Sequence, residues 1–187
     1  MRLVLATRNE HKRRELARLL PRHEVVALPD RVALPPETGD TFAANALEKA
    51  RAAARALGEP AIADDSGIEA VALGGAPGVR SARFAGERAT DAENLARLRR
   101  EAPAGSALAY VCALAYVGAD GEQLFEGRCT GSLAAQQRGA GGFGYDPVFL
   151  PDGEGSGRTM AELSDSEKDA LSHRGRAARS LEAWLGR

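Results

Sequence analysis

Two adjacent carboxylates mark a place in this sequence where phosphate chemistry could occur. Asp64 and Asp65 follow the short apolar run of residues 61–63 and precede Ser66. Neighbouring carboxylates that are buried together repel each other, and a divalent cation relieves that repulsion. Magnesium in proteins takes a few carboxylates together with water and phosphate oxygens. The pair therefore favours a metal-assisted reaction at phosphate over a simple polar turn.

A second polar segment, residues 7–12, joins a predicted N-terminal strand to a predicted helix. Such a turn exposes backbone N–H groups at the positive end of the helix, where phosphate groups bind well. Lys12 would add a point charge, but the GxxxxGK[ST] pattern of a Walker loop is absent. By itself the segment is more typical of a solvated turn. Its candidate residues are Thr7, Arg8, Asn9, Glu10, His11 and Lys12.

A third group of polar residues surrounds the start of a long predicted helix. Glu37 precedes the helix, and Asn45 and Lys49 share one face of it because residues four positions apart stack above each other. Carboxylates ahead of a helix are often only caps or partners of the helix dipole. Taken alone, this group is better explained as a helix start than as a binding site.

Two C-terminal segments could bind a flat polar ligand. The sequence GGFGYDP at residues 141–147 sets Phe143 among glycines, where it could stack on a ligand or equally well fill the core. His173 and Arg174, at a predicted helix start, could donate to a keto oxygen or a phosphate, or could simply be solvated. The candidates from these segments are Phe143, Gly144, Tyr145, Asp146, Lys168, His173 and Arg174.

The candidate residues lie on a chain in which predicted strands and helices alternate. Strands are predicted over residues 2–6, 24–28, 61–63, 107–117 and 123–133; the third runs into residues 64–67, and the last two form a hairpin. Helices are predicted between the turn at residues 7–10 and Pro21, over residues 41–57 and 90–101, and over 173–185 with Ser172 as N-cap. The 107–117 strand is apolar on both faces, which is typical of a central strand covered on both sides.

Composition limits the possible partners and locations. The 187 residues include 25 basic and 26 acidic side chains, a formal net charge of -1, so we expect no nucleic-acid partner and no anionic membrane. Cys112 and Cys129 lack the spacing of a zinc site and the density of a disulfide scaffold, so they are expected to be reduced. The length suits a single domain, residues 1–187. No signal peptide and no bilayer-spanning run is visible, which predicts a location in the cytoplasm.

Taken in order, these segments resemble the inosine triphosphate pyrophosphatase family, the non-canonical purine nucleoside triphosphate pyrophosphatases. The resemblance covers nearly the whole chain and rests on LATRNEHK, ETGDTFAANALEKA, AIADDSGIEAVALGGAPGVRSARFAG, GGFGYDPVF, TMAEL, EK and LSHRG. A chance match to five ordered motifs is far less plausible than a match to one. The chain departs from the family at His11, where Gly is frequent, at Ala44, where Glu is frequent, and at Asp169, where Asn is frequent.

The resemblance implies magnesium-dependent hydrolysis of ITP, dITP and XTP between the α- and β-phosphates, giving the monophosphate and pyrophosphate. Asp65 would then be the principal carboxylate at the metal and the attacking water, with Asp64 supporting it and Glu37 also binding Mg2+. Whether Asp65 is the general base or only a ligand stays open. The phosphates and the leaving pyrophosphate would be held by Lys12, Lys49, Asn9 and Ser66.

Base selection is expected to depend on the 6-keto oxygen and the N1–H of hypoxanthine and xanthine. Arg174 or His173 could donate to the keto oxygen, and Asp146 or a backbone carbonyl could accept from N1–H. Adenine would leave buried polar groups unpaired, which is a strong means of rejection. Guanine shares both features, so its rejection must depend on its 2-amino group, and the sequence assigns no residue to that task.

The resemblance further implies an α/β fold with an elongated mixed central sheet flanked by helices, two lobes with the active site in the cleft between them, and a homodimer. Two other functions stay open: a Maf-like pyrophosphatase acting on other nucleotides, and a nucleotide-binding module without catalysis. The SHRG and GGFGYDP segments argue against the first, and the intact Asp64, Asp65 and Glu37 argue against the second.

Overall fold

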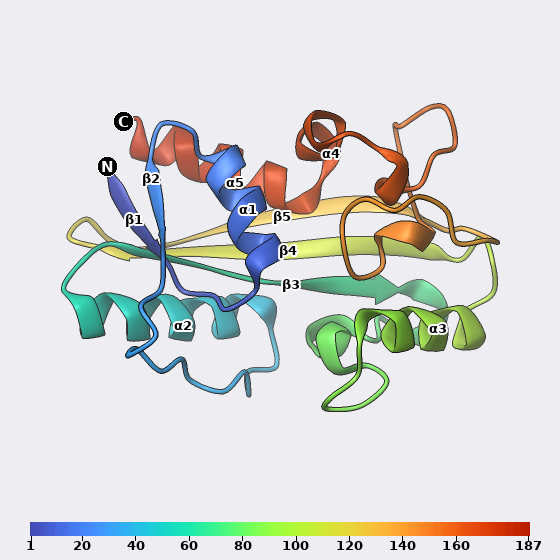
Figure 1. Ribbon diagram of the computed structural model, residues 1–187, viewed down its shortest axis with the longest axis horizontal. Helices are drawn as coiled ribbons and strands as arrows, with labels where there is room; N and C mark the ends of the chain where they lie inside the picture. The colour runs from blue at the N-terminus through green and yellow to red at the C-terminus, as the bar shows by residue number, and fades with distance from the viewer. The chain divides into compact units, whose positions relative to one another are not determined.

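The computed structural model describes residues 1–187 and contains six strands and five α-helices (Figure 1). The strands are β1 (Arg2–Leu5), β2 (Glu24–Ala27), β3 (Ala61–Ala70), β4 (Ala107–Gly118), β5 (Gly121–Leu133) and β6 (Phe149–Pro151). The helices are α1 (Glu10–Leu19), α2 (Phe42–Leu57), α3 (Asp91–Glu101), α4 (Asp165–Leu171) and α5 (His173–Leu185). Short 3-10 turns lie at Val71–Leu73, Gly78–Arg83, Asp146–Val148 and Met160–Glu162.

All six strands belong to one sheet, in the order β2-β1-β3-β4-β5-β6. β1 pairs in parallel with both β2 and β3, whereas β6 pairs antiparallel with β5. The sheet is therefore mixed, and helices flank its strands (Figure 1). This confirms the predicted α/β class, and the position of β4 between β3 and β5 confirms that it is a central strand.

The chain divides into two compact units, each with its own hydrophobic core. Unit 1 consists of Met1–Asp65, Cys112–Gly127 and Arg174–Arg187, and unit 2 consists of Ser66–Val111 and Arg128–His173. β3, β4 and β5 each contribute residues to both units. Along the chain, one boundary between the units falls directly after Asp65 and another directly after His173.

In unit 1, helices cover both faces of the strands. α2 lies on one face, while α1 and α5 lie on the other (Figure 1). The α1 and α5 face is an apolar cluster that includes Leu3, Leu16, Ile62, Leu114 and Leu181. On the opposite face, the buried alanines at positions 46, 50 and 53 form the inner side of α2. Alanine there costs no side-chain entropy in a helix, which suits a helix pressed against a sheet.

Helix ends in unit 1 follow the capping residues in the sequence. The Asn9 side chain accepts from the backbone N–H groups of His11 and Lys12 and so begins α1. Thr41 caps α2 in the same way by accepting from the backbone N–H of Ala44. Gly58 ends α2 with φ +65°, a left-handed conformation that glycine adopts without steric cost. These caps fix α2 within one residue of its predicted bounds.

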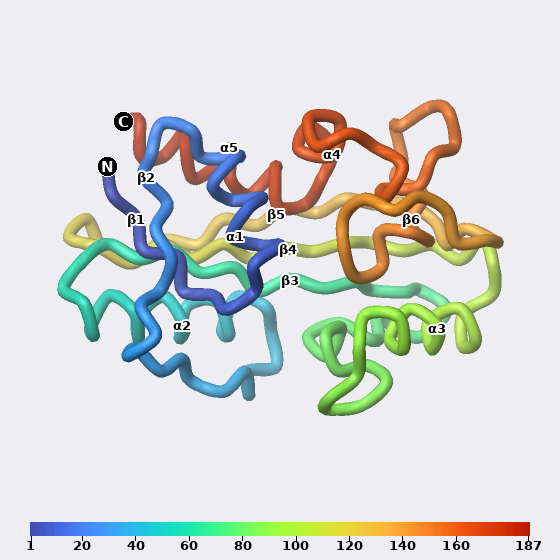
Figure 2. The backbone as a smooth tube through the Cα atoms, in the orientation of Figure 1, coloured from blue at the N-terminus to red at the C-terminus, as the bar shows by residue number.

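In unit 2, α3 and α4 lie on opposite sides of the strands (Figure 1). Its core includes Ile68, Leu98, Tyr110, Phe149 and Met160. The long loop of residues 134–145 runs beside β6, as the backbone trace in Figure 2 shows. Backbone hydrogen bonds hold this loop, among them Arg138 N–H to Pro147 O at 2.9 Å and Gly141 N–H to Ala161 O at 3.0 Å.

The structure extends the third predicted strand beyond residue 63. β3 continues through residues 64–67 to Ala70, and Asp64 and Asp65 are only 0% and 6% exposed within it. The polar residues 64–67 interrupt the apolar pattern by which a buried strand is predicted. Buried carboxylates are tolerated when cations contact them, and here those cations are Lys12, Lys49 and Arg174.

Two elements were not predicted, β6 and α4. α4 has a capping box that the sequence does show, because Ser164 is followed three residues later by Glu167. β6 has only three residues, too few for a periodic pattern. As for membranes, the chain contains no helix that is both long and apolar enough to span a bilayer.

Candidate functional site

Asp65 lies at the centre of a polar cluster in unit 1. Its Oδ2 accepts a hydrogen bond of 2.9 Å from the Asn45 side-chain amide, and its Oδ1 lies 3.5 Å from Lys49 Nζ. The same Lys49 Nζ lies 2.5 Å from Glu37 Oε1. Asn45 and Lys49 are both buried residues of α2 and contact the same carboxylate, which confirms the prediction that they share one face of the helix. Two carboxylates thus converge on one ammonium group.

The surroundings of Asp65 make its carboxyl group more basic. Burial raises its pKa above the usual value, and this outweighs the opposing effect of the Lys49 and Lys12 charges. For Lys49, burial acts to lower the pKa, but the carboxylates of Asp65 and Glu37 outweigh it and raise the pKa. Lys49 therefore stays charged. The Asp65 carboxylate binds a proton more readily than an ordinary aspartate does.

Asp64 has a different environment on the opposite face of β3, because successive side chains of a strand point to opposite faces. Its Oδ1 pairs with Lys12 Nζ, and its Oδ2 accepts from Arg174 Nε at 2.9 Å and from the Cys112 thiol at 3.0 Å. Burial alone would raise the pKa of Asp64, but Arg174 and Lys12 hold it well below its usual value. Asp64 is therefore a permanently charged anchor for two cations.

Arg174, one of the two candidate donors to the base, is buried at the start of α5. It is 1% exposed, its Nε donates to Asp64, and its Nη1 pairs with Glu15 of α1. Two carboxylates of unit 1 thus contact its guanidinium group. Glu15 was not predicted as a site residue. A sign of it was available, since Glu15 interrupts the apolar face of α1 beside Leu16.

Most residues of the N-terminal turn have partners within the protein. The Arg8 guanidinium donates to the backbone oxygens of Leu28 and Val32, each at 2.8 Å, and so holds the following loop. Glu10 pairs with Arg13 on the exposed side of α1. Asn9 caps the helix, and the Thr7 hydroxyl accepts from the Asn9 N–H at 3.1 Å. His11 is exposed one residue before Lys12, whose ammonium group turns toward Asp64.

Lys12 and Lys49 meet at one backbone oxygen. The Asp64 carbonyl oxygen lies 3.5 Å from Lys12 Nζ and 2.9 Å from Lys49 Nζ. Two ammonium groups that share one acceptor must lie close to each other, and each also pairs with carboxylates of the same cluster. We call Asp64, Asp65, Glu37, Lys12 and Lys49 the carboxylate–lysine cluster.

A second polar cluster is built entirely within unit 2 around Asp146, which is 3% exposed. Asp146 Oδ1 accepts from the Tyr110 hydroxyl at 3.0 Å. Oδ2 accepts from Lys168 Nζ at 2.6 Å and from the Phe143 backbone N–H at 2.9 Å. Lys168 Nζ also lies 5.1 Å from the centre of the Phe143 ring. We call Tyr110, Phe143, Asp146 and Lys168 the Asp146 cluster.

Gly142 allows the backbone of the glycine loop to approach Asp146. Its φ is +68°, and a Cβ atom at this position would collide with Asp146 Oδ2. Any other residue would both strain the turn and displace the carboxylate. The glycine loop thus serves to bring the Phe143 N–H onto Asp146.

The neighbours of the Asp146 cluster have structural partners. The Gly144 N–H donates to Asp91 at 2.9 Å, and the Tyr145 hydroxyl donates to the Ser81 carbonyl at 2.8 Å. These bonds fasten the glycine loop. His173 is 5% exposed and stacks on Tyr110, with ring centres 4.6 Å apart and planes 6° apart. Ser66 follows Asp65 on β3 and is half-buried.

Magnesium fits the carboxylate–lysine cluster by its donor chemistry. Glu37 Oε1 and Asp65 Oδ1 both face Lys49 Nζ, so a cation already occupies the position between them. No group of three or more His, Cys, Asp and Glu side chains is arranged to hold a metal. Magnesium does not require such a cage, since it is commonly held by one or two carboxylates and substrate phosphates. Glu37 and Asp65 are therefore sufficient candidates.

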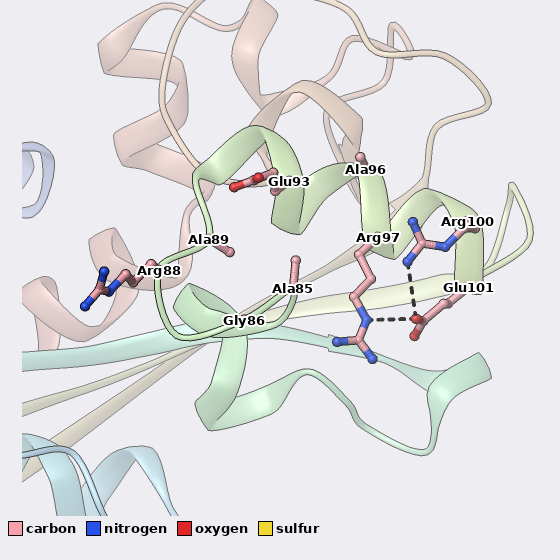
Figure 3. Close-up of a pocket in the computed structure, with 9 residues that line it drawn as sticks. All are labelled: Ala85, Gly86, Arg88, Ala89, Glu93, Ala96, Arg97, Arg100 and Glu101. Atoms are coloured by element: carbon pink, nitrogen blue, oxygen red, sulfur yellow. Dashed lines mark hydrogen bonds and ion pairs between the residues drawn. The ribbon is translucent and has the colours of Figure 1, made fainter.

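Unit 2 also contains an open hollow of about 660 Å³ along α3 (Figure 3). Arg97 and Arg100 turn toward Glu101 there, with N–O distances of 2.8 and 3.8 Å. None of the predicted site residues lines it. Its positive charges are largely matched by glutamates, so we assign it no function.

Comparisons with known proteins place the chain in a family. The model described as the Ham1 family matches residues 3–184. The chain belongs to the Ham1 family. A dITP/XTP pyrophosphatase of Frankia alni is 50% identical, and the alignment covers 99% of this chain and 97% of that protein. A dITP/XTP pyrophosphatase of Geobacillus kaustophilus is 49% identical, with 97% and 93% covered.

Solved Ham1 structures have the same fold. A HAM1 protein from Coxiella burnetii aligns over 100% of this chain and 98% of its own, with 39% identity and a TM-score of 0.85. The Staphylococcus aureus Ham1 protein aligns over the same shares, with 36% identity and a TM-score of 0.84. The family resemblance found in the sequence is thereby confirmed. The roles of the candidate site residues of this chain stay predictions.

Proposed function

We propose that this protein hydrolyses non-canonical purine nucleoside triphosphates, such as ITP, dITP and XTP, to the monophosphate and pyrophosphate. Membership of the Ham1 family and relatives named dITP/XTP pyrophosphatase support this reaction. The observation that carries it is the position of Asp65, buried with a raised pKa beside Lys49 and facing the same ammonium group as Glu37. Removal of these nucleotides from the cellular pool, with the cytoplasm as the place of action, is the predicted physiological role.

The carboxylate–lysine cluster is proposed to bind the phosphates. Lys12 and Lys49 supply two positive charges, and Asn9 and Ser66 are the further predicted contacts. Such charges stabilise the negative charge that develops on the leaving pyrophosphate. Asp64 takes part by holding Lys12 in place, because one of its oxygens pairs with Lys12 while the other is occupied by Arg174.

Glu37 and Asp65 are the residues that would hold Mg2+. The ion would withdraw charge from the triphosphate and help to orient the attacking water. Asp65 is proposed as the carboxylate that orients this water and accepts its proton, since a carboxyl group with a raised pKa is a better base than an ordinary aspartate. The Asn45 amide, which donates to Asp65 Oδ2, supports this role by restricting the orientation of the carboxylate.

The Asp146 cluster is proposed to bind the base. Phe143 would stack on the purine, and Asp146 would accept from N1–H. His173, which packs on Tyr110, is the proposed donor to the 6-keto oxygen. Because Arg174 is buried between Asp64 and Glu15, we now propose that it supports the phosphate-binding residues and not the base.

A substrate panel tests the proposed function. Pyrophosphate release would be measured from ITP, XTP, GTP and ATP, with Mg2+ and with a chelator. We expect release from ITP and XTP that requires Mg2+ and clearly exceeds release from GTP and ATP. Preference for the canonical nucleotides GTP or ATP would favour the Maf-like alternative, and binding without release would favour a non-catalytic module.

We also propose that the protein forms a homodimer, as the family resemblance implies. Light scattering coupled to size-exclusion chromatography would measure the mass directly. A mass near twice the chain mass of 19.7 kDa is expected, and the mass of one chain would contradict the proposal.

A further inference from the structure

Tyr110 is a residue of the Asp146 cluster that the sequence did not distinguish from its apolar neighbours on β4. Its ring is 7% exposed and packs against Phe149, with ring centres 4.7 Å apart, and against His173 at 4.6 Å. Its hydroxyl donates to Asp146 Oδ1 at 3.0 Å. Because a central strand and two ring contacts hold the side chain, the hydroxyl has a fixed direction.

The hydrogen bonds to Asp146 leave it with a limited capacity to accept more. A carboxylate offers about four lone-pair positions, two on each oxygen. Oδ2 already accepts from two donors, the Lys168 ammonium and the Phe143 N–H. Oδ1 accepts from Tyr110 alone. One acceptor position therefore remains for a ligand, and it lies on Oδ1.

Purine bases differ in how many donors they present on the edge that a carboxylate binds. Guanine has two adjacent donors, N1–H and the 2-amino group, which point to the same side and can both donate to one carboxylate oxygen if its two lone-pair positions are open. Hypoxanthine has N1–H and no 2-amino group. Xanthine has N1–H between two keto oxygens. One remaining acceptor position matches hypoxanthine and xanthine but leaves a guanine donor unpaired, which is costly in a buried site.

We propose that Tyr110 is a specificity-determining positioning residue, whose hydroxyl rejects guanine by occupying the acceptor position on Asp146 that the 2-amino group would use. The inference rests on the proposed function, in which Asp146 accepts from the base. Tyr110 acts through Asp146 and does not itself touch the reacting atoms. This supplies the discrimination between guanine and hypoxanthine that no residue in the sequence motifs explained.

The test is Tyr110→Phe, which removes the hydroxyl and keeps the ring contacts. The matched control is Tyr116→Phe in unit 1, because the Tyr116 hydroxyl is buried without a hydrogen-bond partner. For each protein, kcat/KM would be measured for ITP, XTP and GTP. Tyr110→Phe is expected to raise the ratio of GTP to ITP by about tenfold or more, the size of one hydrogen bond to a charged group. Tyr116→Phe is expected to leave the ratio unchanged.

Equilibrium binding of IMP, XMP and GMP separates this inference from the proposed function. The ratio of GMP to IMP affinity should rise in Tyr110→Phe to the same degree as the kinetic ratio, whether or not any triphosphate is cleaved. Failure of the wild-type protein to release pyrophosphate from ITP would contradict the proposed function alone. An unchanged GTP-to-ITP ratio in a folded Tyr110→Phe protein would overturn the inference alone, as would an equal change in Tyr116→Phe.

A wild-type measurement keeps the inference testable if Tyr110→Phe does not fold. The native protein should bind GMP at least about tenfold more weakly than IMP, because one donor of guanine lacks an acceptor. Equal affinities, or no binding of any purine monophosphate, would overturn it.

Discussion

At the residue scale, two neighbouring aspartates have different chemistry because they lie on opposite faces of one strand. Asp65 faces Asn45 and Lys49 of α2, and burial raises its pKa. Asp64 faces Lys12 and Arg174, which hold its pKa well below the usual value. The sequence motif presents them as a pair, but only the alternation of the strand explains why one suits proton transfer and the other suits anchoring.

The low pKa of Asp64 predicts how stability depends on pH in metal-free protein. A carboxylate whose pKa is depressed on folding stabilises the native state above its unfolded pKa of about 3.9 and loses this contribution as the pH falls through the folded value. Asp64→Asn removes that contribution. We expect the difference in unfolding free energy between wild type and Asp64→Asn to narrow on acidification from pH 6 to pH 3.

Urea denaturation at a series of pH values would measure this difference. Asp152→Asn is a suitable control, because Asp152 is exposed. A constant difference between wild type and Asp64→Asn over the whole range would show that Asp64 is not anchored by its cations.

At the element scale, α1 and α5 are joined by a buried ion pair between Glu15 and Arg174, which are 159 residues apart in sequence. No local pattern in the sequence indicates such a pair, and for this reason Arg174 was a candidate, with His173, for donating to the base. Helix bounds, in contrast, were predictable from local residues such as Thr41 and Gly58. What the sequence could not supply were the long-range partners that allow charges to be buried, including those that keep Asp64 and Asp65 within β3.

Glu15→Gln tests the connection between α1 and α5. The change removes the Glu15 charge from the buried guanidinium of Arg174, and breaking a buried pair costs roughly 3–5 kcal/mol. Glu122→Gln is the matched control, because Glu122 pairs with Arg51 at the surface, where an ion pair contributes little to stability. Urea denaturation at neutral pH would compare the two. Equal losses would mean that the Glu15–Arg174 pair contributes no more than a surface pair.

At the scale of the whole molecule, a chain with a net charge of -1 attracts a triphosphate only through local groups. Unit 1 supplies the ammonium groups of Lys12 and Lys49 around one carbonyl oxygen. Unit 2 supplies Asp146, with its acceptor positions mostly filled. The family and the α/β class could be predicted from ordered motifs, and most residues of the two polar clusters lie in those motifs. Tyr110 could not, because a tyrosine in an apolar strand gives no sign of where its hydroxyl points.

The most direct measurement is the rate of pyrophosphate release from ITP by wild type and Asp65→Asn at saturating Mg2+. If Asp65 orients the attacking water and accepts its proton, turnover should fall by about 100-fold or more. The thermal midpoint should show that the variant is folded, and Asp152→Asn should retain full turnover. Turnover of folded Asp65→Asn within twofold of wild type would contradict the account.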